Sequence, residues 1–567
     1  MIKHFCKIIL GIYLTTLFIS CKKDYLSYDI SNGVFNAAQV WYSDRNTRAF
    51  LTSTYYGLSS PTSTASSSSL ASRYNIDGSG SMLSEGSDEA ISTNTASIMY
   101  NMINGSWSPT NLVDDNYAAL YSYIRKTNMF IANVGNSAVY PQSDTLELKS
   151  EAYFLRAYFY FELLERYGGV PIVTRVLSPT DNLIVPKNSY DEVVAQIAKD
   201  CDSAVVGLPL ANGALGDQRT PLSWDDGDRG RATQIAALAL KCRTFLYAAS
   251  PLNNPNNELS RWQAAADVAN QIIQSKADSL LTGPNYSTFW DYDVPGVAFN
   301  SEVIFATAPL QINSVDQNNA PIGFNSAKGI CNPTQDLVDA FETKTGYPIT
   351  DARSGFNPQN PYSKRDLRLS YFILFNGTSF KGRAVKSYVG GSDNVLSNIN
   401  STKTGYYMRK FLSESATWNS TPAVTRTRPW IIFRYAEVLL NYAEALNEVQ
   451  GPVQSVYDAV NAVRARVLLP GLPTGISQDS MRTRIQNERR VELCFEDHRF
   501  FDIRRWKLAN TFLSGDIKGV NIQSVGGTLT YTYQVVGNRV WNDKYYYYPF
   551  PQEQVNKDPK LVQNPGY

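Results

Sequence analysis

Apolar residues recur with helical spacing in pairs of segments that are joined by short turns. Residues 231–249 are followed, across a Pro- and Asn-rich turn at 251–255, by a second such segment at 260–275. Gly168-Gly169 and Gly451-Pro452 carry the residues at which helices commonly stop. The same periodicity predicts further helices, at residues 117–134, 146–167, 190–206, 434–449, 453–467, 479–494 and 500–509.

Small residues mark the faces on which these helices are expected to pack. Ala232, Ala236 and Ala239 share one face of the first helix of that pair, and Ala265 and Ala269 share one face of the second. Such spacing suits closely packed antiparallel helix repeats. Two long segments rich in Gly, Asn, Pro, Ser and Thr, 276–333 and 345–428, interrupt the pattern. We therefore predict a mainly α protein in which tetratricopeptide-like helix pairs form a scaffold and long irregular loops carry the ligand site.

The N-terminus has the layout of an export signal. Basic residues precede an apolar run at 8–19, which is too short to cross a bilayer core that needs about 20 apolar residues and suits a signal peptide. Ser20-Cys21 then resembles a lipobox, although Phe18 stands where Leu is usual. This predicts removal of residues 1–20 and lipid attachment to Cys21, where several acyl chains would hold the protein to a membrane. The alternative is an ordinary signal peptide with an incidental cysteine.

Charge and histidine content exclude several function classes. The 52 basic and 51 acidic residues cancel, so nothing points to nucleic acid or an anionic surface. After the signal, His498 is the one histidine left. That argues against a histidine metal site and a Ser-His-Asp triad, and no zinc, Walker or nucleophile-elbow motif occurs. We expect no catalytic residue, no cofactor and no metal ion. A disulfide framework is not expected in a chain of 567 residues.

Several segments, in order along the chain behind the lipobox, together resemble the SusD/RagB family of nutrient-binding lipoproteins of Bacteroidetes outer membranes. Asp497 stands where that family often has Gly. The segments are Phe154 to Phe161 with Arg166 to Pro171, Gly230 to Thr233, Pro333 to Leu337, Arg434 to Leu440 with Tyr442 to Ala445, Glu488 to Trp506, Pro549 to Gln552, and Gln563 to Tyr567.

The resemblance implies an architecture, a location and a partner. Residues 21–567 would form one SusD-like domain, with an N-terminal part at 21–229 and a C-terminal part at 230–567 that contains the two insertions. The protein would be lipid-anchored in the outer membrane and face the cell exterior. Its partner would be a SusC-like TonB-dependent transporter, on which it sits like a lid. The family imports glycans in most cases and peptides in some.

Charged and tyrosine-rich motifs that look like sites are interpreted as structural. Acidic and basic residues alternate at helical spacing around His498, which favours mutual ion pairs over phosphate binding. Glu437, Asn441, Glu444 and Glu448 lie on one helix face, most simply a solvated or paired one. The run Tyr545 to Tyr548 is interpreted as packing in an extended segment. The charged cluster comprises Glu488, Arg489, Arg490, Glu492, Glu496, Arg499, Asp502, Arg504 and Arg505.

Candidate ligand residues come from the loops, because a sugar site needs aromatic platforms beside amide, carboxylate or guanidinium groups. Starch-binding relatives use the loop around an Asp-Glu-Ala element, here residues 88–90, and the mid-chain insertion. Residues 91–95 lack the tryptophans that those relatives present, which argues against a starch-like ligand. For each candidate, packing and ligand contact remain open alternatives. The candidates are Tyr74, Asn75, Asp77, Asn285, Tyr286, Trp290, Asp291, Tyr292, Asp293 and Phe324.

The sequence leaves three candidate functions. The first is binding of an oligosaccharide and its delivery to a transporter, without catalysis. The second keeps the scaffold and makes the ligand a peptide, with a larger and less aromatic pocket. The third is a glycoside hydrolase that uses paired carboxylates such as Asp291 and Asp293. It requires two carboxyl groups about 5–10 Å apart across a cleft, one of them with a raised pKa.

Overall fold

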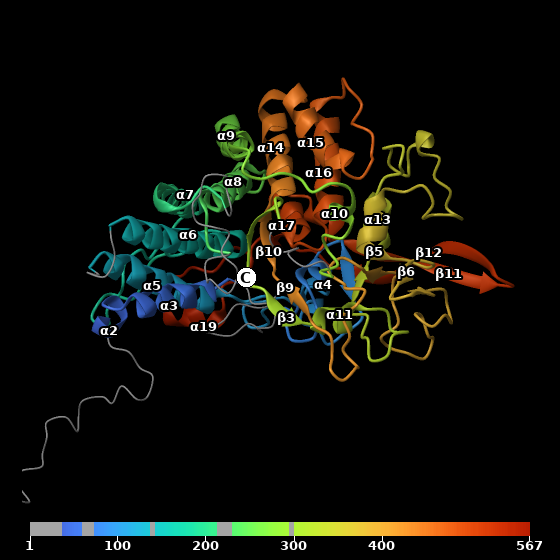
Figure 1. Ribbon diagram of the computed structural model, residues 1–567, viewed down its shortest axis with the longest axis horizontal. Coiled ribbons are helices and arrows are strands. Elements are labelled where there is room, and N and C mark those ends of the chain that lie inside the picture. The colour runs from blue at the N-terminus through green and yellow to red at the C-terminus, as the bar shows by residue number, and fades with distance from the viewer. Residues whose placement is uncertain (1–36, 59–72, 137–141, 212–229, 294–299) are drawn as a thin grey trace, which may run out of the picture.

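A continuous stack of helices forms the body of the protein in the computed structural model, which describes residues 37–58, 73–136, 142–211, 230–293 and 300–567 (Figure 1). The helices of the stack are α5 (Tyr117–Asn133), α6 (Gln142–Tyr167), α7 (Tyr190–Gly207), α8 (Gln234–Ala249), α9 (Leu259–Ser275), α14 (Tyr435–Gln450), α15 (Gln454–Ala465) and α16 (Gln478–Glu492). Each packs on the next from α5 to α9, and α14 joins α9 to the last two. The predicted mainly helical scaffold of packed helix pairs is confirmed.

Side-chain caps set where several of these helices begin. Ser189 and Glu192 form a capping box at the start of α7, which satisfies main-chain N–H groups that have no partner within the helix. Thr233 accepts a hydrogen bond from the main-chain N–H of Ala236. α8 therefore begins at Gln234 rather than at the predicted residue 231.

The remaining helices are short and lie at the ends of the stack or in the loops, and no described helix is long and apolar enough to cross a membrane. They are α2 (Ala37–Trp41), α3 (Asp44–Tyr55), α4 (Tyr100–Ile103), α10 (Gly283–Ser287), α11 (Ser314–Asn319), α12 (Gln335–Ala340), α13 (Leu367–Phe372), α17 (His498–Arg505), α18 (Ala509–Phe512) and α19 (Gln552–Lys557), with 3-10 turns η3 (Leu83–Gly86), η4 (Val134–Asn136), η6 (Ala352–Ser354) and η7 (Asp543–Tyr546).

Two-stranded antiparallel sheets connect distant parts of the chain. Five are short: β1 (Ala90–Ser92) with β4 (Cys331–Pro333), β2 (Val303–Ala306) with β10 (Ile431–Arg434), β3 (Leu310–Ile312) with β9 (Arg426–Arg428), β5 (Ile373–Leu374) with β8 (Tyr407–Met408), and β6 (Ser379–Phe380) with β7 (Arg383–Ala384). The sixth is a long hairpin, β11 (Gly515–Val525) with β12 (Thr528–Arg539), which projects from the side opposite α5 (Figure 1). None of these strands was predicted from the sequence.

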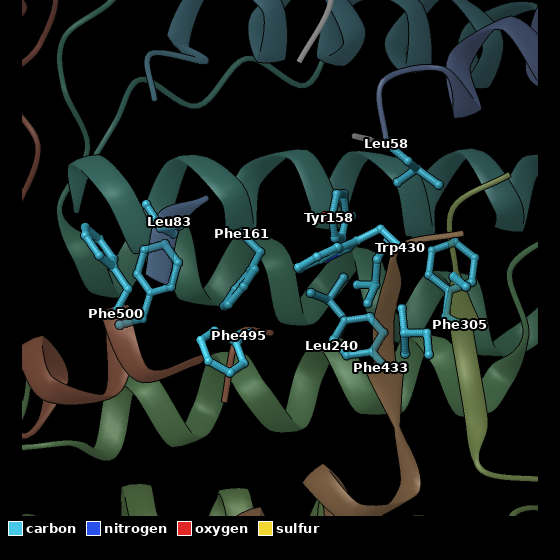
Figure 2. Close-up of a cluster of buried hydrophobic side chains, with 14 of the residues drawn as sticks. Leu58, Leu83, Tyr158, Phe161, Leu240, Phe305, Trp430, Phe433, Phe495 and Phe500 are labelled. Atoms are coloured by element: carbon cyan, nitrogen blue, oxygen red, sulfur yellow. The ribbon is translucent and has the colours of Figure 1, made fainter. Parts of the chain in front are cut away.

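The main apolar core lies where α6 and α8 meet the strands that follow the insertions. Tyr158 and Phe161 of α6 face Leu240 of α8, with Phe305 of β2 and Phe433 of β10 beside them (Figure 2). Such burial supplies most of the stabilising free energy of a fold. The strands that frame the insertion loops are therefore fixed directly to the helical scaffold.

A half-exposed aromatic patch on the insertion loops

The first rings of the mid-chain insertion cover buried cations instead of facing solvent. Tyr286 is 1% exposed and Trp290 is 3% exposed. The Arg466 guanidinium lies 3.9 Å from the Tyr286 ring centroid, and the Lys410 ammonium lies 4.1 Å from that of Trp290. Cation–π attraction strengthens when the partners are desolvated. Of the two alternatives left open for these rings, the structure shows packing.

Tyr292 and Tyr74 form a second buried contact between the insertion and the loop at residues 73–82. Their hydroxyl oxygens are 3.4 Å apart, and Tyr74 donates to the Pro429 carbonyl at 2.8 Å. The Arg428 guanidinium lies 5.1 Å from the Tyr292 ring centroid. Both rings are buried, so of the two alternatives left open for them the structure again shows packing.

Beneath these rings lies a network of charged side chains with almost no exposure. Glu492 accepts from Arg434 at 2.8 Å and from Arg368 at 3.0 Å, and it also pairs with Arg466. Tyr286 donates its hydroxyl to the same carboxylate at 3.0 Å. Burial opposes ionisation, but the three guanidinium groups hold the pKa of Glu492 well below its usual value. The rings seal this network from water, which gives the physical reason for their burial.

The polar candidates of the first loop stabilise local turns. Asn75 accepts a hydrogen bond from the Gly80 main-chain N–H at 2.7 Å. Asp77 accepts from the Ser97 hydroxyl at 2.7 Å and from the Ile98 main-chain N–H at 3.0 Å. These contacts satisfy the oxygen atoms that a ligand would otherwise use.

The aspartates of the insertion differ in environment. Asp293 accepts hydrogen bonds from Arg426 at 2.8 Å, from the Glu414 N–H at 2.8 Å and from the Ser413 hydroxyl at 2.5 Å. Against the effect of burial, these donors lower the pKa of Asp293. Burial raises the pKa of Asp291, whose carboxylate accepts from the Asp293 N–H at 3.1 Å. Asp293 thus connects two loops. Asn285, another candidate, is exposed.

Phe324 differs from the other ring candidates because it remains half-exposed. The Arg383 guanidinium lies 3.9 Å from its ring centroid, and Phe380 packs edge-on at 5.5 Å. Asp393 holds Arg383 at 2.7 Å and also accepts from the Gly323 N–H at 3.2 Å. The loop that follows α11 is thereby fixed to the β6–β7 turn.

Trp418, which was not among the candidates from the sequence, lies half-exposed on a third loop. Its indole N–H donates to the Asn325 carbonyl at 2.8 Å. The Lys381 ammonium lies 5.4 Å from its ring centroid and donates to the Ala416 carbonyl at 2.6 Å. We call Phe324, Asn325, Lys381, Arg383 and Trp418 the Phe324–Trp418 patch. An isolated tryptophan in the polar stretch 413–422 was the sequence signal that could have revealed it.

The patch combines features that suit a polyhydroxylated ligand. Ring faces provide apolar platforms, and the flanking ammonium and guanidinium groups are donors. Asp393 raises the pKa of Arg383 through its hydrogen bonds, so the guanidinium stays charged. Within the part of the chain that the structure describes, no group of acidic, histidine and cysteine side chains is arranged to hold a metal ion.

The motifs interpreted as structural are engaged in packing and ion pairs. Glu437, Glu444 and Glu448 pair with arginines of neighbouring helices, in one case Glu444 with Arg505. His498 is buried. Its burial, and to a smaller extent the nearby cations, hold its pKa well below the usual value. Asp497 has a φ of 67°, a left-handed conformation that glycine adopts most easily, which explains why the resembling family often has Gly there.

The predicted tyrosine packing is also observed. Tyr545 and Tyr548 of the tyrosine run are buried against Trp107. Cys201, Cys242, Cys331 and Cys494 are buried free thiols. The predicted lipid attachment at Cys21 lies outside the described residues.

Comparison with known proteins identifies the family. A model described as the SusD family matches residues 259–567, which is more than half of the chain. The chain belongs to the SusD family. A second model, described as starch-binding and associating with the outer membrane, matches residues 51–246.

Known SusD-like proteins resemble the chain over most of its length. A SusD-like protein of Formosa agariphila is 25% identical over 414 residues, 70% of each chain. A SusD-like protein from Bacteroides fragilis superposes with a TM-score of 0.77 at 27% identity, covering 94% of this chain and 99% of that one. A SusD-like carbohydrate binding protein of the same organism gives 0.75 at 26% identity, covering 92% and 100%.

Family membership decides between binding and catalysis. SusD family members are binding proteins without catalytic activity, so the prediction that this protein is not an enzyme is confirmed. The hydrolase alternative based on Asp291 and Asp293 is therefore dropped. Association with the outer membrane agrees with the description of the second model. The resemblance stated from the sequence motifs is likewise confirmed.

Proposed function

We propose that this SusD family protein binds an oligosaccharide at the Phe324–Trp418 patch and delivers it to a SusC-like TonB-dependent transporter in the outer membrane. One observation carries the proposal. Two half-exposed aromatic rings from separate insertion loops lie beside Lys381 and Arg383, each held in place by main-chain or carboxylate contacts. A preorganised aromatic surface with fixed donors loses little conformational entropy when a ligand binds.

Similarity supports a sugar as the ligand. The Bacteroides fragilis relative at 26% identity is described as a carbohydrate binding protein, and the model over residues 51–246 is described as starch-binding. Residues 91–95 contain no tryptophan, so we propose a glycan other than starch. A peptide ligand is the second candidate and uses the same loops.

Binding measurements on the purified protein test the ligand class. A panel of neutral oligosaccharides and a panel of peptides are titrated by calorimetry against wild type, Trp418→Ala and Phe324→Ala. We expect at least one glycan to bind and both variants to weaken it. Tyr56→Ala serves as the matched control, because Tyr56 is 65% exposed at the C-terminal end of α3. Peptide binding without glycan binding, or unchanged glycan affinity in both patch variants, would overturn the proposal.

Delivery to a transporter is tested separately. The lipidated protein is tagged at its C-terminus, expressed in a Bacteroidetes host that encodes it and purified from outer membranes in mild detergent. We expect a TonB-dependent transporter to co-purify in a constant ratio and to be identified by mass spectrometry. The extended helical stack offers a surface of the kind that suits a large protein contact. Purification without such a transporter would refute this half of the proposal.

A further inference from the structure

A cavity of about 510 Å³ lies between α13 and the loop that follows α15. Ligand pockets in proteins have volumes of about 300–1,000 Å³. The cavity shares no residue with the Phe324–Trp418 patch. Its walls include Lys344, Tyr362, Lys364, Arg365, Phe375 and Leu468.

Arg365 gives this cavity a buried positive charge without a carboxylate partner. Its side chain donates to the Pro361, Val338 and Phe341 carbonyl oxygens at 2.6–2.8 Å. Its Nε atom has no hydrogen-bond partner among the described residues, and no described acidic group forms an ion pair with it. Burial lowers the pKa of Arg365. The Asp339 and Asp366 carboxylates favour its charged form without pairing with it, and the Phe356 ring centroid lies 5.4 Å from the guanidinium. A buried cation without a direct ion pair is costly, and an anion bound beside it would reduce that cost.

Two lysines add to the positive charge. Lys344 and Lys364 are both exposed, and within the described structure neither ammonium takes part in an ion pair or hydrogen bond. The main-chain N–H of Lys344 donates to the Lys364 carbonyl at 2.8 Å, so the two lysines stand side by side. Asp366, the acidic residue in the lining, is occupied by Arg368 at 2.7 Å. The electrostatic balance of the cavity is therefore positive.

Apolar surface accompanies the charge. Tyr362 stacks on Phe375 with centroids 4.2 Å apart and an angle of 25° between the rings, and both rings are half-exposed. Leu468 is 80% exposed with a φ of 61°. Lys364, with a φ of 54°, shares this left-handed conformation, which is uncommon for residues other than glycine. Strain of this kind concentrates at functional sites.

We propose that this cavity is a second ligand site, which binds a sugar that carries a carboxylate or sulfate group. The anionic group lies against Lys344, Lys364 and Arg365, and the sugar ring lies against the Tyr362–Phe375 pair. The choice of a sugar rests on the proposed glycan-binding function, whereas the anion preference rests on the cavity alone.

Trigalacturonate is the probe, and its methyl ester is the matched neutral ligand. Both are titrated by calorimetry at low ionic strength against wild type, the double variant K344Q/K364Q and the control K199Q/K560Q. Glutamine keeps much of the side-chain length and removes the charge, and both pairs of lysines are exposed, so folding is preserved. We expect trigalacturonate affinity to fall about tenfold in K344Q/K364Q, to weaken with added salt, and to stay unchanged in K199Q/K560Q and in Trp418→Ala.

Equal binding of the ester, or unchanged trigalacturonate affinity in K344Q/K364Q, would overturn the inference. Galactose 6-sulfate added as competitor separates the two sources of charge: displacement extends the site to sulfate esters, and lack of displacement assigns it to carboxylates. If the wild-type protein binds a neutral glycan but does not bind trigalacturonate, the inference is wrong and the proposed function stands. If it binds trigalacturonate but no neutral glycan, the patch proposal is wrong and the anion site stands.

Discussion

Aromatic rings contact cations in two regions of this protein that differ in exposure. In the insertion segment 283–293, Trp290 covers the Lys410 ammonium at 4.1 Å and is 3% exposed. In the Phe324–Trp418 patch, Phe324 contacts Arg383 at 3.9 Å and remains half-exposed. The pairing is chemically the same, but its surroundings decide the role. Over a buried ion network the ring excludes water, whereas on the loops it leaves a surface that a ligand can reach.

The difference follows from what lies underneath each ring. Trp290 lies over Lys410, which pairs with Glu496 and donates to the Glu492 main-chain carbonyl. These buried groups lose most of their hydration on folding. Removing one member of such a network leaves its partners uncompensated. The patch stands instead on loop joints such as Arg383 with Asp393, in which the arginine side chain is 32% exposed. Asp393 is fully buried in this pair, but Arg383 keeps part of its hydration, so less charge is desolvated here than beneath Trp290.

The largest expected effect comes from breaking the buried network. Glu492→Ala removes the partner of Arg434, Arg466 and Arg368 and should lower the free energy of unfolding by about 3–5 kcal/mol. Urea unfolding followed by circular dichroism measures the change. Glu258→Ala is the control: this glutamate pairs with Arg261 at the surface, and the loss should stay below about 1 kcal/mol. Equal effects of the two substitutions would mean that the buried network contributes no more to stability than a surface pair does.

Trp290→Ala should also destabilise the fold strongly, by about 3–5 kcal/mol, because a large buried ring leaves a cavity and uncovers Lys410. Affinity for the glycan, corrected for the folded fraction, should not change. Denaturant unfolding and calorimetry on the same preparation provide both values. A variant that keeps its stability and loses glycan binding would restore Trp290 as a ligand contact.

The helical scaffold was predictable because it depends on local periodicity. Helices α5, α7, α9 and α14 begin and end within about two residues of their predicted bounds, which is the usual uncertainty of helix ends. The ion pairs around His498 were predictable for the same reason, since alternating charges at helical spacing place partners together. These features need little knowledge of distant segments.

The candidate site was less predictable because its members are far apart along the chain. Trp418 meets Asn325 through a contact between residues 93 positions apart, which no local pattern encodes. The clustering of Tyr286, Trp290 and Tyr292 in sequence suggested an aromatic ligand site, with packing as the open alternative. Their burial depends instead on Arg466, Lys410 and Arg428 of later segments. Of the rings proposed from sequence, Phe324 alone lies half-exposed in the described structure.

Trp418→Ala should show the opposite profile to Trp290→Ala. Because the ring is half-exposed and its N–H contacts a loop carbonyl, the free energy of unfolding should fall by about 1 kcal/mol or less. Glycan affinity should fall about five- to tenfold through loss of a stacking surface. Calorimetry against the best glycan of the panel measures it, with Tyr56→Ala as the exposed aromatic control. Strong destabilisation with unchanged affinity would place Trp418 in the same class as Trp290.

The smallest effect concerns Asp291, at the boundary between the two environments. Partial burial raises the pKa of its carboxyl group above the unfolded value, so the folded state holds the proton more tightly. Stability gained from this proton is complete below the unfolded pKa of about 4 and is lost as the pH rises through the higher folded value. Asp291→Asn keeps an oxygen that can accept from the Asp293 N–H and does not ionise. The stability of this variant relative to wild type should therefore increase slightly between pH 4 and pH 7 in urea unfolding. A difference that stays constant across this range would mean that the Asp291 carboxylate is as well solvated in the folded protein as in the unfolded chain, and that solvent reaches deeper into the insertion than the burial of Trp290 indicates.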